Sequence, residues 1–99
     1  MIDLTQYQHQ LIELCQKFSV KQLYIVGSAA REDFDPDQSD IDLVVDFEGK
    51  NNLCHRYFDL KFELEDLFER KVDMIQISAV KNPYLKESLE KDRVRVYES

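Results

Sequence analysis

Apolar residues recur every three or four positions in parts of the chain, and this spacing predicts helices. The first helix is expected over residues 3–18 and the longest over residues 53–70. Asn82 followed by Pro83 predicts the start of another helix, because Asn caps helix N-termini and Pro suits the first turn. The predicted core positions of the first two helices are Leu4, Tyr7, Leu11, Leu14, Phe18, Tyr57, Leu60, Leu64, Leu67 and Phe68.

Phe58 and Phe62 lie outside the core stripe of the second helix and widen its apolar face. A helix that packs between a sheet and a neighbouring element can bury a wide face, so we expect both rings to be mostly buried. The alternative is that part of this face stays exposed for a partner.

Other stretches carry strand patterns. Residues 22–26 end in a short continuous apolar run, which is typical of a buried strand, and residues 41–47 alternate apolar and polar positions. Residues 72–77 also predict a strand, although Asp73 lies inside it. Residues 93–97 alternate charged and apolar side chains, which suits the edge of a sheet.

The order of these elements predicts an α+β fold in which a mixed sheet of about four strands packs against two to three helices. The chain has 99 residues, of which 43% are hydrophobic. A chain of this length has room for one core, so a single domain over residues 1–99 is expected.

The charge of the chain limits the kinds of partner that are expected to bind it. The formal net charge is -7, from 20 acidic and 13 basic residues, and no basic block is longer than a pair. Direct binding of nucleic acid is therefore not expected, whereas a basic protein partner fits. The first ten residues lack the features of a signal peptide, and no apolar run approaches the roughly 18 residues that span a membrane. We expect no membrane association and a cytoplasmic location.

The cysteines and histidines show no metal-binding or disulfide spacing. Cys15 and Cys54 are far apart and belong to no Cys-x-x-Cys pair, so both are predicted to be buried thiols. His9 and His55 are isolated and are assigned to the surface or to helix packing.

The chemistry of the chain gathers in residues 27–42. Gly27 and Ser28 end the first predicted strand, where backbone N–H groups and a hydroxyl can meet phosphate. Asp40 and Asp42 open the second strand, and side chains two residues apart on a strand share a face about 7 Å apart. The two carboxylates can therefore converge on one hard cation, Mg²⁺ or Mn²⁺. Asp73 is a third carboxylate in a half-buried strand, where burial requires a partner or a metal.

Two other interpretations compete with this one. Asp33, Asp35 and Asp37 alternate like the first ligands of an EF-hand, but Gln38 stands where that loop needs glycine and Val44 where it needs glutamate. A calcium loop is therefore rejected. The second interpretation is purely structural, with an ordinary turn after the first strand, and it leaves Asp42 and Asp73 unexplained.

The combination of these motifs resembles the nucleotidyltransferase superfamily related to DNA polymerase β, and within it the minimal nucleotidyltransferases of toxin–antitoxin pairs. The resemblance covers essentially the whole chain, through LYIVGSAAR, SDIDLVVDF and LEDLFERKVDMI. It implies the small nucleotidyltransferase fold. One departure is visible: residues 29–39 make eleven positions between the Gly-Ser pair and the first Asp, one more than the usual family spacing.

The resemblance implies a role for each site residue. Asp40 and Asp42 would hold two Mg²⁺ ions, and Asp73 would ligate the metal beside the attacking hydroxyl or act as its base. Gly27 and Ser28 would bind the phosphates. Arg31 would neutralise the charge of the leaving pyrophosphate.

The resemblance also implies the reaction and its partner. The enzyme would transfer AMP from ATP to a hydroxyl, a tyrosine of a HEPN-type ribonuclease toxin, and so act as an antitoxin in a hetero-oligomer. Two alternatives remain open: an antitoxin that neutralises by binding alone, and a stand-alone enzyme that nucleotidylates a small molecule.

Overall fold

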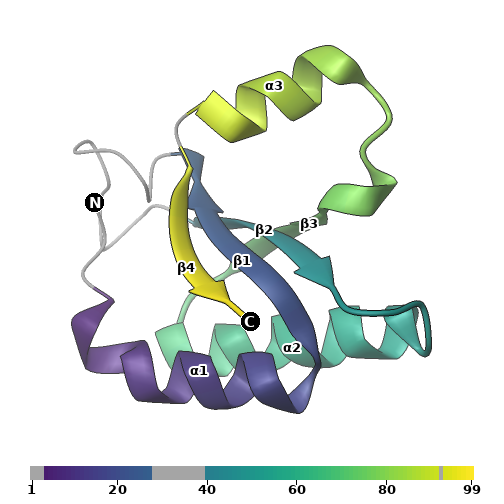
Figure 1. Cartoon of the computed structure of the whole chain (residues 1–99). Coiled ribbons are helices and arrows are strands. Elements are labelled where there is room, and N and C mark those ends of the chain that lie inside the picture. The colour runs from purple at the N-terminus through teal and green to yellow at the C-terminus, as the bar shows by residue number, and fades with distance from the viewer. Residues whose placement is uncertain (1–3, 28–39, 92) are drawn as a thin grey trace.

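The predicted alternation of helices and strands is present in the structure, a computed structural model that describes residues 4–27, 40–91 and 93–99 (Figure 1). The elements in order are η1 (Thr5–Tyr7), α1 (Gln8–Lys17), β1 (Val20–Val26), β2 (Ile41–Phe47), α2 (Leu53–Phe68), β3 (Val72–Gln76), η3 (Ile77–Ala79), α3 (Pro83–Lys91) and β4 (Val94–Glu98). Each predicted helix and strand is found, with ends that differ by a few residues. The largest difference is at the first helix, which begins with the 3-10 turn η1.

The strands form one mixed sheet in the order β3-β2-β1-β4. β1 pairs antiparallel with both β2 and β4, whereas β2 and β3 run parallel. The parallel pair follows from α2, because a parallel connection needs a long crossover between its strands. β4 lies at one edge, as its charged alternation predicted. The α+β fold with a four-stranded mixed sheet is therefore confirmed.

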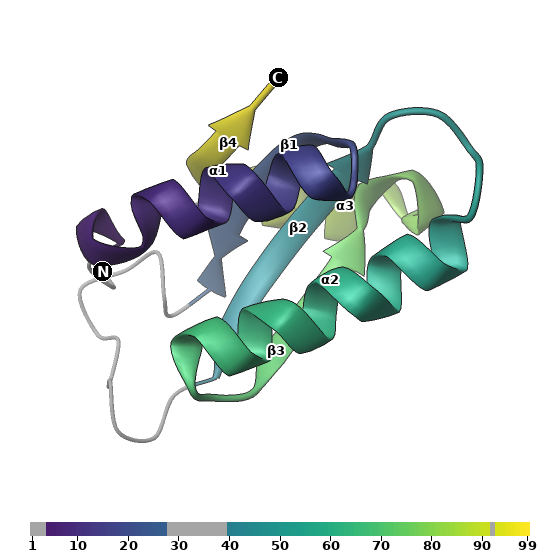
Figure 2. The same cartoon turned by 90° about the horizontal axis from the view of Figure 1, so that it is seen from below.

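The helices lie on both sides of this sheet. α1 and α2 run side by side across one face, and α3 lies beyond the opposite face (Figures 1 and 2). No helix of the described part of the chain is long and apolar enough to cross a membrane.

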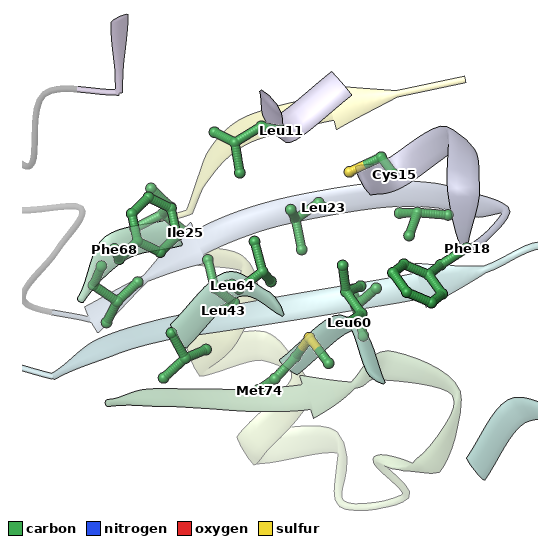
Figure 3. Packing of buried hydrophobic residues seen from close by; sticks show 14 of the residues in the cluster. Leu11, Cys15, Phe18, Leu23, Ile25, Leu43, Leu60, Leu64, Phe68 and Met74 are labelled. Atoms are coloured by element: carbon green, nitrogen blue, oxygen red, sulfur yellow. The ribbon is translucent and has the colours of Figure 1, made fainter. Parts of the chain in front are cut away.

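The hydrophobic core fills the space between the sheet and the α1–α2 layer. Leu23 and Leu43 of the sheet meet Leu60 and Leu64 of α2, with Leu11 of α1 above them (Figure 3). The predicted positions Leu11, Phe18, Leu60, Leu64 and Phe68 are buried, and Leu4, Tyr7, Leu14, Tyr57 and Leu67 are partly buried against them. The two helical stripes are therefore confirmed as core.

Cys15 and Cys54 have opposite environments. Cys15 is buried at 0% exposure among core residues, and this burial raises the pKa of its thiol to about 12. Cys54 is exposed, so its predicted burial is wrong. The reason is its place on α2: Cys54, Phe58 and Phe62 are spaced four residues apart and lie along a stripe beside the core-facing one.

The expected burial of Phe58 and Phe62 is also wrong. Their side chains are 45% and 58% exposed, and their rings stack with centroids 6.4 Å apart. The sheet and α1 pack against another side of α2, and the described residues cover this second stripe only in part. The alternative prediction of an exposed apolar face is the one that agrees with the structure.

Candidate active site

Two of the three predicted carboxylates lie on paired positions of neighbouring strands. Asp42 of β2 pairs with Asp73 of β3 in the parallel register, and on its other side it pairs with Val26, the last residue of β1. Ile41 and Leu43 on either side of Asp42 are buried in the core. Because side chains alternate along a strand, the Asp42 carboxylate lies on the opposite face of the sheet from the core.

Asp73 follows the same alternation. Its neighbours Val72 and Met74 are buried under α2, whereas Asp73 itself is exposed on the other face. A backbone hydrogen bond from Ile41 N to Lys71 O, 3.1 Å long, joins the starts of β2 and β3. The two strands therefore begin side by side, and their carboxylates lie at the same end of the sheet. Asp40, immediately before β2, is exposed at the same end.

Gly27 follows the last residue of β1 and lies directly beside Asp42. Its backbone has φ of +67°, and a Cβ atom built there would lie 2.6 Å from Oδ2 of Asp42. Both observations favour glycine, because a side chain would strain the backbone and displace the Asp42 carboxylate. Gly27 thus allows close approach of the chain to Asp42. Ser28 and Arg31, the other predicted phosphate-binding residues, lie outside the described residues.

The three carboxylates interact electrostatically. Partial burial raises the pKa of Asp42 above its usual value, and the charges of Asp73 and Asp40 raise it further. The charge of Asp73 also reaches Tyr57 of α2, whose pKa is raised first by burial and then by Asp73. The three carboxylates therefore concentrate negative charge at this end of the sheet, which favours a bound cation.

The side chains themselves are not gathered as a finished metal cluster. Within residues 4–27, 40–91 and 93–99, no three His, Cys, Asp or Glu side chains converge closely enough to hold a metal ion. The residue types still fit Mg²⁺, which takes hard oxygen ligands and is held in proteins by one or two carboxylates. Asp42 and Asp73 supply such oxygens from paired strand positions.

Sequence reasoning missed the hydrogen bond of Tyr57. It lies in the core stripe of α2 as predicted, but its hydroxyl donates a hydrogen bond to the backbone oxygen of Met74, next to Asp73. The bond joins α2 to β3 one residue away from Asp73. Nothing in the local sequence signals it, because the contact spans 17 residues.

A family model described as a nucleotidyltransferase domain matches residues 9–96 of the chain. The chain belongs to the nucleotidyltransferase family. The match spans α1 to β4 and so contains both strands that carry the carboxylates. The chain is therefore an enzyme of the nucleotidyltransferase class, as its motifs implied.

Relatives of this nucleotidyltransferase carry the names of protein adenylyltransferases. It is 40% identical over 83 residues to the Methanocaldococcus jannaschii protein named "Putative protein adenylyltransferase MJ0128", covering 84% of this chain and 83% of the relative. It is 34% identical over 70 residues to the Thermococcus cleftensis protein named "Protein adenylyltransferase MntA", covering 71% and 69%.

Solved structures share its fold. A structure described as a "putative minimal nucleotidyltransferase" superposes with a TM-score of 0.78 at 26% identity, covering 92% of this chain and 90% of that one. The fold also occurs in a structure described as a tri-AMPylated Shewanella oneidensis HEPN toxin in complex with MNT antitoxin, at a TM-score of 0.70 and 14% identity, covering 98% of this chain and 74% of that one. The chain is thus a minimal, MNT-type nucleotidyltransferase.

Replacing Gly27 by Ala in the nucleotidyltransferase is expected to lower the rate of nucleotidyl transfer roughly 10- to 100-fold, because the new methyl group displaces the Asp42 carboxylate. Melting temperatures and steady-state rates of both proteins measure the effect. The matched control is Gly49→Ala, which has similar positive φ but no atom within 4 Å of the new Cβ. Equal rates for the two alanine variants would contradict the close approach of Gly27 to Asp42.

The stability of the nucleotidyltransferase should depend on pH through Asp42. Its pKa is raised on folding, so the folded state binds this proton more tightly than the unfolded state, and stability is lost as pH rises through the raised pKa. Asp42→Asn removes that loss.

At pH 7 without divalent cations, the Asn variant should therefore melt at a higher temperature than the wild type, and the gain should vanish below pH 3.8, the ordinary pKa of aspartate. Added Mg²⁺ should raise the melting temperature of the wild type more than that of the variant. A variant that melts lower than the wild type at pH 7 would contradict the cost of holding a partly buried Asp42 charge near Asp73 and Asp40.

Proposed function

We propose that this nucleotidyltransferase is an antitoxin that transfers AMP from ATP to a tyrosine hydroxyl of a HEPN-type ribonuclease toxin and thereby neutralises it. The observation that carries the proposal is the pairing of Asp42 with Asp73 across β2 and β3, beside the glycine that follows β1. The proposal is supported by a relative named as a protein adenylyltransferase and by the AMPylated toxin in a complex of the same fold.

Each of the three carboxylates would have its own role in the reaction. Asp40 and Asp42 would hold the divalent ions, preferably two Mg²⁺, with Mn²⁺ as a substitute. Asp73 would ligate the ion nearer the acceptor or take its proton. When bound, the ions supply Lewis-acid stabilisation of the phosphates. Asp40 and Asp73 are exposed, so their side chains can turn toward Asp42 at little cost.

At the α-phosphorus, the reaction forms one bond and breaks one. The acceptor oxygen attacks the α-phosphorus in line, the bond from that phosphorus to the pyrophosphate oxygen breaks, and the hydroxyl proton passes to Asp73 or to water. Gly27 leaves room for the phosphates beside Asp42. Ser28 would bind them through its hydroxyl, and Arg31 would neutralise the charge that develops on pyrophosphate.

The acceptor would arrive on another protein. A net charge of -7 favours encounter with a basic, RNA-cleaving partner. The exposed rings of Phe58 and Phe62 add apolar area of the kind found at protein interfaces. These features support a hetero-oligomer with the toxin. A single domain over residues 1–99 and a cytoplasmic location, where such a toxin acts, belong to the same proposal.

The test is the intact mass of the toxin. The purified chain is incubated with the cognate HEPN protein, ATP and Mg²⁺, and mass spectrometry of the toxin should show added AMP on a tyrosine. A toxin with the modified tyrosine replaced by Phe is the control and should gain nothing. An unmodified toxin that is still inhibited would overturn AMP transfer in favour of neutralisation by binding. Nucleotidylation of a small molecule without the toxin would favour a stand-alone enzyme.

A further inference from the structure

A hollow of about 220 Å³ opens on the same face of the sheet as Asp42. Its floor is formed by alternate residues of β1 and β2, and its walls come from η3, α3 and the residue before β4. The lining residues are Gln22, Tyr24, Val44, Asp46, Ile77, Lys86 and Arg93.

The hollow begins one step along the strands from the carboxylates. Val26 pairs with Asp42, and the next pair on this face is Tyr24 with Val44. Two residues of a strand span about 7 Å. A nucleotide whose α-phosphate lies at Asp42 therefore has room for its ribose before the hollow begins.

The lining combines flat, apolar and charged groups. The Arg93 guanidinium lies over the Tyr24 ring, with Cζ 4.4 Å from the centroid, while Val44 is buried in the floor. Asp46 is half-buried, and among the described residues its carboxylate has neither a hydrogen bond nor an ion pair. A half-buried carboxylate without a donor is costly, so a ligand that donates to it would bind favourably.

We propose that this hollow holds the base of the nucleoside triphosphate and that Asp46 accepts a hydrogen bond from the exocyclic amino group of adenine. The inference rests on the proposed function and adds a base-recognition site to it. A nucleobase is planar and amphipathic, which suits Val44 and Ile77 together with the stacked Arg93–Tyr24 pair. Lys86 at the wall can donate to a ring nitrogen of the base.

The acceptor tyrosine is the competing occupant, and the strand order disfavours it. Asp73, proposed to lie nearest the attacking hydroxyl, belongs to β3. The hollow is floored by β1 and β2, the strands that carry Gly27 and Asp42, and neither Asp73 nor Ile75 of β3 lines it. It therefore lies on the nucleotide side of the carboxylates.

The experiment compares ATP with ITP, which has an oxygen in place of the 6-amino group. Dissociation constants of both nucleotides are measured by calorimetry with Mg²⁺ and no acceptor, and kcat/KM is measured with the HEPN acceptor. The wild type should prefer ATP roughly 10- to 100-fold, because a carboxylate repels the oxygen of ITP. In Asp46→Asn the preference should fall to within about threefold, because an amide can donate to that oxygen. The loss should appear in KM more than in kcat.

Asp59→Asn is the matched control, an exposed aspartate on α2, and it should keep the wild-type preference. Asp46→Ala is a second variant and should lose the preference as well; both variants are checked by circular dichroism. An unchanged ATP preference in the folded Asp46 variants overturns the proposal. So does a rise in the KM for the acceptor with ATP binding unchanged, which would assign the hollow to the acceptor.

The base site and the proposed function can fail separately in this experiment. A wild type that binds ATP over ITP but transfers no AMP would keep the base site and remove the proposed function. AMP transfer without any preference between the nucleotides would keep the proposed function and remove the base site. A wild type that binds neither nucleotide overturns both.

Discussion

Asp42→Asn is expected to lower AMP transfer at least about 1000-fold, because it removes the carboxylate that lies between Gly27 and Asp73 and would bind the divalent ion. Asn keeps the size of the side chain but has no negative charge. The fold should remain, since Asp42 lies on the face of the sheet away from the core. The measurement is the initial rate of AMP incorporation into the HEPN protein.

Binding and chemistry should separate in this variant. Asp42→Asn should still form the complex with the toxin, as measured by size-exclusion chromatography, while the toxin gains no AMP. Asp59→Asn on the exposed side of α2 is the charge-matched control and should keep full activity. Full suppression of toxicity by Asp42→Asn without any AMP on the toxin would instead favour neutralisation by binding alone.

Arg56→Met is expected to give the largest loss of stability among these substitutions, about 2–4 kcal/mol, because Arg56 joins three segments through charge-assisted hydrogen bonds. Its guanidinium donates to the backbone oxygens of Phe18 at 3.2 Å, Glu48 at 2.9 Å and Asn51 at 2.9 Å. It also lies over the Phe47 ring, with Cζ 5.0 Å from the centroid.

These contacts hold the end of α1, the end of β2 and the turn into α2 together. Met retains much of the apolar stem but leaves the three carbonyl groups without their shared donor. Thermal unfolding should show a drop of roughly 10 °C or more, since 1 kcal/mol shifts the melting temperature of a domain this size by about 4–8 °C.

Arg95→Met is the matched control for this loss. Arg95 forms an exposed ion pair with Glu98 on the edge strand, and such pairs contribute about 0–1 kcal/mol. Nucleotide binding should survive in folded Arg56→Met, because Arg56 contacts none of the carboxylates or the lining of the hollow. Equal melting temperatures for the two variants would contradict the joining role of Arg56.

Burial on α2 shows where periodicity stops being informative. The spacing correctly placed Leu60, Leu64 and Phe68 in the core, since a helix buries the stripe that faces the sheet. The spacing could not predict the exposure of Cys54 and Phe62, which lie on the neighbouring stripe. Whether a second stripe is covered depends on which other elements pack there, and that is not encoded within the helix.

The sequence by itself determined the helices and strands, and it predicted the residues of the candidate site. Alternation places Asp42 on one face of its strand, and the apolar residues around Asp73 predict a strand there, because both patterns depend on local backbone geometry. The motifs of the sequence also carry the resemblance to nucleotidyltransferases, and the match of the family model confirms that family.

Only the tertiary structure decided which of these residues meet. Three arrangements join distant parts of the chain: the register that pairs Asp42 with Asp73, the close approach of the Gly27 backbone to the Asp42 carboxylate, and the gathering of Tyr24, Asp46 and Arg93 around one hollow. Strand pairing is set by the packing of the whole core. A local pattern fixes the face on which a side chain lies, but only packing fixes its neighbour on the next strand.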